Sequence, residues 1–453
     1  MKKSVLSVLL AASSCFAGEL TVKVTADKSN AIYKSGETAV ITAAALEDGK
    51  PVSGRTVLYD FIADGNVRKK GKFVSSAEKP FVLKHKFTYP SALRAEFTIL
   101  DAKGNRIPLK KGYDQVRYAG GRIGAVADPE KILPAAKTPA DFDAFWNSQL
   151  KRLAAVPMKV LEKKQVSRLS NAVKNKYNVL DVKISCVDNV PVSGIITIPK
   201  KAKAKSLPAI LLVQGAGVGS AHVYSCLNWS NQGAICMEIN AHGVPNGMPA
   251  KYYNDIKNSR LKNYYSKVYP NREQHIFVNM ALRVIRALEY LRTLPEWNGK
   301  DLIIRGASQG GWQAIVGAGL DKKVTLCLAG VPGFGDFDGE FSPAKRMPRM
   351  HFGGAIRQQS KKGKAHVQKL LKEQSYFDPV NFAPKVTCPV ISSCRWRRLL
   401  KSQTALATAQ RPRNGARKRM RWPRGRLRRS STRTARLACG RSLLASSQSR
   451  RRC

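Results

Sequence analysis

The stretch Leu302-Ile303-Ile304-Arg305-Gly306-Ala307-Ser308-Gln309-Gly310-Gly311 decides the fold of this 453-residue chain. It begins as an apolar strand, and the apolar periodicity that follows predicts a helix from Gly310 to Leu320. Between them stands Gly-x-Ser-x-Gly, the pattern of a nucleophile elbow. Glycines two residues before and after Ser308 leave room for a tight turn that points the serine Oγ outward. The sequence therefore predicts Ser308 as a catalytic nucleophile; the alternative is a glycine-rich turn with an exposed serine.

Such a nucleophile needs backbone amides that stabilise the negative charge developing on the substrate oxygen. The amide of Gln309, at the start of the expected helix, is one candidate. The amide of Ala216 is the second, because Gln214-Gly215-Ala216-Gly217 follows an apolar strand; a plain glycine turn is the alternative. His242 follows the next strand along the chain, at the edge where ligands bind in such sheets. It is a candidate for substrate contact, and a histidine with only local hydrogen bonds is the alternative.

Apolar strands alternate with helices from Leu207 onward, which indicates a parallel sheet covered on both faces. A hairpin at 177–198 and a helix opening at Thr138, with Thr138 as its cap, precede this region. We expect strands at 208–213, 233–239, 302–304, 324–329 and 386–392, and helices at 273–294 and 310–320.

Residues 19–120 show a different pattern, with short alternating strands separated by turn residues such as Asp48-Gly49 and Asp64-Gly65. This spacing predicts a β-sandwich of immunoglobulin-like type, followed by a linker at 121–137. An extension of the catalytic sheet is the alternative.

From Thr138 to about Ser393 the chain resembles the acetyl xylan esterase and cephalosporin-C deacetylase family. The resemblance is carried by Asp141–Trp146, by Ser308-Gln309-Gly310-Gly311 and by Val331-Pro332. It implies an α/β-hydrolase that deacetylates carbohydrates, chiefly acetylated xylan and its oligosaccharides, through an acyl-serine intermediate. In that likeness Ser308 is the nucleophile, and the backbones of Ala216 and Gln309 form the oxyanion hole. Members often assemble into rings, which makes a homo-oligomer a candidate state.

The chain departs from that family in one loop. Members usually show His-Gly-Tyr where this sequence has Gln214-Gly215-Ala216, so the aromatic side chain that would shape the acyl pocket is absent. The acetylated sugar that the chain prefers is therefore left open by the sequence.

The catalytic acid and histidine are not found where the fold requires them. In this fold they follow the nucleophile, the acid after the strand at 386–392 and the histidine after the next strand. No Asp or Glu follows that strand, and none of the histidines does; these are His85, His222, His242, His275, His351 and His366. The last part of the hydrolase fold is thus missing or aberrant, and we expect the chain as written to be inactive.

Residues 394–453 differ from everything before them. From Arg395 onward there are twenty Lys and Arg residues and no Asp or Glu. One hypothesis is a natural basic tail on a non-catalytic binding protein. The other, which we favour, is that translation left the reading frame near Ser393 or Cys394, so that this segment is out of frame or disordered. The net charge of +49 invites a nucleic-acid partner, but an exported polysaccharide enzyme has no evident use for one.

The N-terminus predicts export. Lys2 and Lys3 precede an apolar run, and a small-residue cleavage site ends at Ala17, so residues 1–17 read as a signal peptide of a secreted or periplasmic protein. Lipoprotein anchoring through Cys15 is the less favoured alternative. We expect no further membrane-spanning segment. Neither a metal site nor a cofactor is expected, and buried thiols are expected at Cys186, Cys236, Cys327 and Cys388.

These observations leave three function classes. A carbohydrate acetyl-esterase leads. A peptidase or other esterase on the same fold is the second, and a non-catalytic carbohydrate-binding protein is the third.

Overall fold

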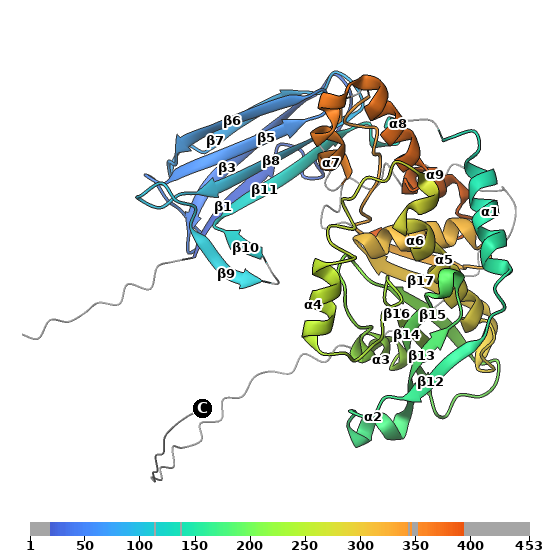
Figure 1. Cartoon of the computed structure of the whole chain (residues 1–453). Helices are drawn as coiled ribbons and strands as arrows, with labels where there is room; N and C mark the ends of the chain where they lie inside the picture. The colour runs from blue at the N-terminus through green and yellow to red at the C-terminus, as the bar shows by residue number, and fades with distance from the viewer. Residues whose placement is uncertain (1–18, 113–114, 136–137, 343–344, 347–351, 394–453) are drawn as a thin grey trace, which may run out of the picture. The chain divides into compact units, whose positions relative to one another are not determined.

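The computed structural model describes residues 19–112, 115–135, 138–342, 345–346 and 352–393 (Figure 1). The predicted signal peptide at 1–17 and the Arg-rich segment at 394–453 lie outside the described residues. In the described part, strands alone make up the region up to Ala127, and strands alternate with helices from Phe142 onward.

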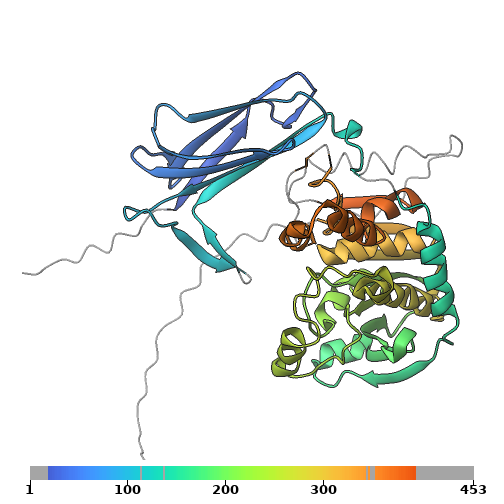
Figure 2. The ribbon, with the colours of Figure 1, turned by 45° about the horizontal axis from the view of Figure 1, so that its top comes forward.

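Two sheets make up most of the N-terminal part, and all their pairings are antiparallel except the short parallel pairing of β2 (Ile32–Tyr33) with β11 (Gly120–Ala127) (Figures 1 and 2). They share one core, in which Ile41, Phe61 and Phe97 are buried. The residues therefore form a β-sandwich, and its immunoglobulin-like character stays a prediction. The first sheet contains β1 (Leu20–Ala26), β3 (Thr38–Glu47), β4 (Lys50–Pro51) and β7 (Phe81–Lys86); the second contains β2 (Ile32–Tyr33), β11 (Gly120–Ala127), β8 (Ser91–Ile99), β5 (Thr56–Ala63) and β6 (Val67–Val74); β9 (Pro108–Gly112) and β10 (Gln115–Tyr118) pair separately.

The linker prediction at 121–137 is wrong at its start. Strand β11 pairs with β8 along its whole length, so the sandwich extends to Ala127. Its glycines are required by close packing: a Cβ on Gly121 would lie 2.0 Å from the Val22 carbonyl oxygen, and one on Gly120 would lie 2.1 Å from the Phe97 carbonyl oxygen. The sequence suggests a loop at Gly120 and Gly121, but in the structure these two glycines allow β11 to lie close to its neighbouring strands.

The second part is built on an eight-stranded sheet in the order β12-β13-β14-β16-β15-β17-β18-β19. The first three pairings are antiparallel and the remaining four are parallel. The predicted hairpin and the predicted parallel strands are confirmed. The strands are β12 (Val160–Gln165), β13 (Tyr177–Ile184), β14 (Val192–Pro199), β15 (Leu207–Val213), β16 (Ile235–Ile239), β17 (Trp297–Ala307), β18 (Leu326–Gly330) and β19 (Val390–Ser393).

Helices cover both faces of this sheet (Figure 1). Leu211 on β15 shares a core cluster with α5 and α6, whereas its neighbour Leu212 packs in a separate cluster with Cys226 of α3. This alternation explains why the strands are apolar throughout. The helices are α1 (Phe142–Ala154), α2 (Asn171–Lys176), α3 (Val223–Ser230), α4 (Ala250–Asn258), α5 (Ile276–Leu291), α6 (Gln309–Leu320), α7 (Phe352–Gln358), α8 (Lys364–Ser375) and α9 (Pro379–Phe382).

The first helix differs from its prediction. Helix α1 begins at Phe142 with Asp141 at its N-cap position, and Thr138 does not cap it. The Thr138 hydroxyl instead donates to Asn381 Oδ1 at 2.9 Å. Trp146 of α1 is buried, and its ring nitrogen donates to the Tyr376 carbonyl at 2.9 Å. The segment before α1 is thus held by tertiary contacts.

The thiols of Cys186, Cys236 and Cys327 are free and buried as predicted, while Cys388 is free and half-buried. Among the described helices, none has both the length and the apolar character needed to cross a bilayer.

Candidate active site

Ser308 lies between β17 and α6 in the strand–turn–helix context that its sequence predicts. Its backbone has φ 58° and ψ −120°, an unusual conformation for a residue with a side chain, and the residue is exposed. Three backbone hydrogen bonds fix it: its N–H donates to Gly330 at 2.9 Å, and its carbonyl accepts from Trp312 at 3.1 Å and Gly333 at 3.0 Å. A backbone conformation that is unfavourable for a residue with a side chain persists only where the surrounding structure imposes it, and such conformations cluster at functional sites.

The glycines around Ser308 are required by close approach to neighbouring backbone. A Cβ on Gly310 would lie 2.3 Å from the Val213 carbonyl oxygen of β15. One on Gly306 would lie 2.3 Å from the Gly310 carbonyl oxygen, and one on Gly311 would lie 2.7 Å from that of Gly330. The elbow can therefore sit against β15 and β18 only if all three positions lack a side chain.

The two backbones expected to form an oxyanion hole lie on adjoining elements. Helix α6 begins at Gln309, so the Gln309 amide lies in its first turn, where helix amides have no partner within the helix. The loop Gln214–Gly217 follows β15, which pairs directly with β17. This loop is tied to the same helix, because Gln313 Nε2 donates to the Gln214 carbonyl at 2.8 Å. Ala216 itself is exposed.

His242 lies behind this loop. Its side chain is only 5% exposed, and its Nε2 lies 3.1 Å from the Gly217 carbonyl oxygen. Burial and the nearby Arg283 lower the pKa of His242 to about 3, so the ring is neutral at physiological pH and its Nε2–H donates to Gly217. This geometry favours the local hydrogen-bonding alternative over direct substrate contact.

Tyr264 is a residue of this region that the sequence does not identify. Its hydroxyl accepts a hydrogen bond from the Gly217 amide at 2.8 Å and donates to Gln309 Oε1 at 2.9 Å. Its ring packs edge-on against His242, with 4.4 Å between the ring centroids. No local motif surrounds Tyr264, because its partners are 47 and 45 residues away along the chain.

The sequence also does not identify a hydrogen-bonded pair in this region, His222 and Glu238. His222 Nδ1 lies 2.8 Å from Glu238 Oε1, and this hydrogen bond raises the pKa of His222. Gln214 Nε2 also donates to the same oxygen at 2.8 Å. Although burial opposes it, the hydrogen bonds from His222 and Gln214 lower the pKa of Glu238, so the carboxyl is ionised. Glu238 thereby anchors the beginning of the Gln214–Gly217 loop.

The remaining described histidines have other surroundings. His275 is buried, with Nε2 3.0 Å from Gln374 Oε1, and His366 Nε2 lies 2.9 Å from Gln359 Oε1. His85 belongs to the β-sandwich, and His351 lies outside the described residues. Among the described residues, no histidine hydrogen-bonds to Ser308. In the sequence, no Asp or Glu follows the end of β19.

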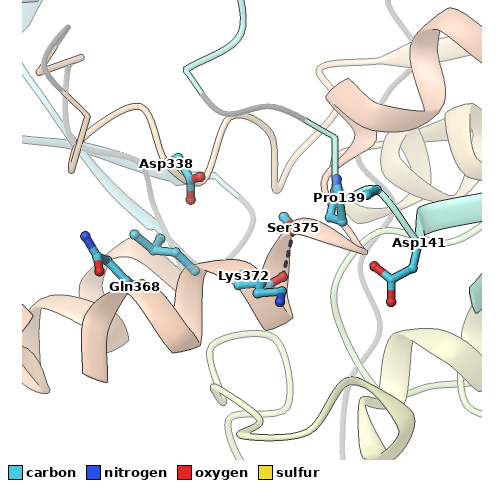
Figure 3. A pocket seen from close by; sticks show the side chains of 8 residues that line it. Pro139, Asp141, Asp338, Gln368, Lys372 and Ser375 are labelled. Atoms are coloured by element: carbon cyan, nitrogen blue, oxygen red, sulfur yellow. Dashed lines mark hydrogen bonds between the residues drawn. The ribbon is translucent and has the colours of Figure 1, made fainter. Parts of the chain in front are cut away.

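A cavity of about 380 Å³ opens between the start of α1, the loop after β18 and α8 (Figure 3). Burial and the neighbouring Asp336 raise the pKa of Asp338 in its wall to about 6. Ser375 donates to the Lys372 carbonyl at 2.6 Å, as Figure 3 shows. Ser308 does not line this cavity, so it is separate from the elbow. Its lining comprises Pro139, Ala140, Asp141, Asp338, Gln368, Leu371, Lys372 and Ser375.

The sheet order, the elbow and the helix after it define an α/β-hydrolase. A solved structure, the acetyl xylan esterase from Paenibacillus sp. R4, has the same fold; it is 19% identical, the match covers 62% of this chain and 88% of that one, and the TM-score is 0.51.

The acetyl xylan esterase (AXE1) family model matches residues 130–396, more than half of the chain. The chain therefore belongs to the acetyl xylan esterase family and is by family a carboxylic ester hydrolase. The acetyl esterase Axe7A from Xylanibacter ruminicola is 29% identical over 266 residues, which are 58% of this chain and 57% of that protein. The chain thus matches only a little over half the length of this relative.

Proposed function

We propose that the chain is a serine esterase that removes acetyl groups from carbohydrates, acetylated xylan or its oligosaccharides, through an acyl-Ser308 intermediate. The observation that supports this most is the exposed Ser308, held at φ 58° at the head of α6 in a member of the acetyl xylan esterase family. The similarity to the acetyl esterase Axe7A and the α/β-hydrolase fold also support ester hydrolysis.

In the proposed reaction, Ser308 Oγ attacks the acetyl carbonyl carbon and the sugar oxygen leaves as the acyl-enzyme forms. The amides of Ala216 and Gln309 stabilise the oxyanion of each tetrahedral intermediate. Water then attacks the acyl group and releases acetate. Formation of the acyl-enzyme and its hydrolysis both need a base that takes a proton and returns it to the leaving group. The described residues supply the nucleophile and the two amides, and no such base is found among them.

We further propose that the base and its acid were lost through a change of reading frame near Ser393. The family match ends at residue 396, and acidic residues are absent from Arg395 onward. Another frame of the encoding DNA beyond codon 394 should contain an acidic residue and a histidine before a stop codon. Their absence from both other frames would overturn this idea.

The proposal can be tested on the chain as written, because a small base in solution can take the place of a missing histidine. We expect acetate release from acetylated xylo-oligosaccharides to rise with added imidazole. Ser308→Ala should remove the whole imidazole-dependent, protein-dependent rate, since the acetyl group then has no acceptor. An equal rate in the two proteins would show that Ser308 is not the nucleophile.

A non-catalytic carbohydrate-binding function is the second candidate, and the incomplete catalytic set among the described residues favours it. Titration of acetylated xylo-oligosaccharides into the full chain separates the two functions. Binding that persists in Ser308→Ala, with no acetate released at any imidazole concentration, would support the binding function alone. We also propose export of the chain, on the strength of residues 1–17.

A further inference from the structure

We propose that Tyr264 is a positioning residue that holds the two halves of the oxyanion hole in register. This inference deepens the proposed function and rests on it. It assigns a role to a side chain whose hydrogen bonds join Gly217 of the loop after β15 to Gln309 of the elbow.

The loop that carries Ala216 cannot fix its own conformation. Gly215, Ala216 and Gly217 have no side chain long enough to anchor it, and Gly217 adopts φ 151°. Glycine retains more conformational freedom than any other residue, so a loop of this composition samples several geometries unless other parts of the molecule hold it. An oxyanion hole needs the opposite, because preorganised donors are the source of its effect.

The Tyr264 hydroxyl supplies such a restraint from another part of the chain. It accepts from the Gly217 N–H at 2.8 Å, which fixes the peptide plane directly after Ala216. It has a single proton, and this proton goes to Gln309 Oε1 at 2.9 Å rather than to the more distant Gly217 carbonyl at 3.3 Å. One hydroxyl therefore connects the loop after β15 with the first residue of α6.

Burial makes this connection rigid. Tyr264 is 3% exposed and the Gln309 side chain is fully buried, so water does not compete for the hydrogen bond between them. His242 completes the arrangement, since its Nε2–H donates to the Gly217 carbonyl while its ring packs against Tyr264. Both polar atoms of Gly217 are thus held by buried side chains.

The arrangement also depends on Tyr264 because its partners have no substitute. Gln309 Nε2 is buried and has no hydrogen-bond partner among the described residues. Without the tyrosine hydroxyl, Gln309 Oε1 would be left unpaired as well, and a buried amide with neither end satisfied would turn toward other partners. A movement of the Gln309 side chain would shift the residue whose backbone amide faces the substrate oxygen.

The test compares Tyr264→Phe with Tyr177→Phe in the full chain. Tyr177 is a matched control, because its hydroxyl also donates to an amide oxygen, Asn231 Oδ1 at 2.6 Å, but belongs to β13. Imidazole-dependent acetate release should fall roughly ten- to thirty-fold in kcat in Tyr264→Phe with KM unchanged, since the oxyanion forms only in the transition state. Tyr177→Phe should keep the parent values.

Amide hydrogen exchange gives a second readout that needs no activity. The Gly217 amide should exchange about tenfold faster or more in Tyr264→Phe than in the parent chain, because its acceptor is gone. Amides in the middle of α5 should keep their protection, which shows that the variant is folded. If the parent chain releases no acetate, the proposed function fails while the exchange result still decides the restraint on the loop.

The double variant Tyr264→Phe/Gln309→Met tests whether Tyr264 acts through Gln309. The two substitutions should lower kcat by little more than either alone, because both break the same hydrogen bond. Three results would overturn the inference. The Gly217 amide could exchange at the same rate in Tyr264→Phe as in the parent chain, or Tyr264→Phe could raise KM and leave kcat unchanged. The third is that Tyr177→Phe lowers kcat as much as Tyr264→Phe does.

Discussion

Ser308 shows how one residue's conformation depends on what its neighbours lack. A serine at φ 58° is held by its own N–H, which donates to the Gly330 carbonyl, and by its carbonyl, which accepts from the amides of Trp312 and Gly333. These hydrogen bonds form only because the elbow lies directly against β15 and β18. The cost of such a backbone conformation is of order 1–3 kcal/mol and must be offset by this packing. The conformation of Ser308 is therefore sensitive to small additions of volume nearby.

Gly310→Ala tests this sensitivity. The added methyl group would meet the Val213 carbonyl oxygen, so we expect β15 and α6 to separate. Unfolding free energy should fall by about 1–3 kcal/mol, and the imidazole-dependent acetate release should fall at least about tenfold. Gly354→Ala serves as control, because its Cβ would make only an ordinary 3.6 Å contact with Arg357. Equal behaviour of the two variants in urea unfolding would contradict the packing argument.

Local sequence is enough to place Ser308 and Gln309 at a strand–turn–helix junction, because the elbow pattern is contiguous and its glycines mark the close approach of neighbouring backbone. It is not enough to locate Tyr264 or the His222–Glu238 pair. Their roles come from hydrogen bonds between segments that only the folded sheet brings together. His242 is an intermediate case: its place after β16 is predictable, but its burial behind the loop is not.

At the scale of elements, the loop after β18 is joined to α9 through a buried carboxyl. Asp378 caps α9, with Oδ1 accepting from Val380 N–H at 3.0 Å, and it also accepts from the amides of Asp336 and Phe337. Burial, with a smaller contribution from Asp336, raises the pKa of Asp378 to about 7. Its protonated form is thus the one that the fold prefers.

This raised pKa predicts a pH dependence of stability. The folded state binds a proton at Asp378 more tightly than the unfolded state does, so this contribution is present below about pH 4 and is lost as the pH rises to about 7. Asp378→Asn cannot titrate, and its unfolding free energy relative to the parent should therefore rise by on the order of 3 kcal/mol between pH 4 and pH 7.5. Buried neutral histidines act in the opposite direction but are common to both proteins. If urea unfolding gave the same pH dependence of the unfolding free energy for Asp378→Asn and the parent chain, the raised pKa of Asp378 would be contradicted.

Periodicity predicts α5, α6 and the apolar parallel strands well, because burial on one or both faces leaves a direct trace in residue order. It fails for β6 and β11. Strand β6 is mostly polar and, among the described strands, pairs with β5 alone. Strand β11 is rich in glycine because it packs closely against its neighbours. Both look like loops until their neighbours are known.

At the scale of the whole molecule, the described sheet ends at β19. Within the described residues this strand pairs with β18 on one side only, and Ile391 is 59% exposed. An apolar edge strand of this kind can pair with another chain. We therefore expect association between molecules to begin at this edge.

Ile391→Lys should slow aggregation, because a charge on an edge strand opposes pairing between molecules. We expect a longer lag and a lower final intensity in light scattering at fixed concentration. Tyr224→Lys is the control, since Tyr224 is 72% exposed but lies on α3. If the control slows aggregation equally, general surface charge rather than the sheet edge is responsible.

The most direct measurement of the central claim is a peptide map of the chain after incubation with acetylated xylo-oligosaccharide and imidazole, quenched in acid. We predict an acetyl group on the peptide that contains Ser308, reduced at least severalfold by Tyr264→Phe and absent from Ser308→Ala. Acetate released by the protein without acetylation of Ser308, or acetylation of another serine in its place, would contradict it.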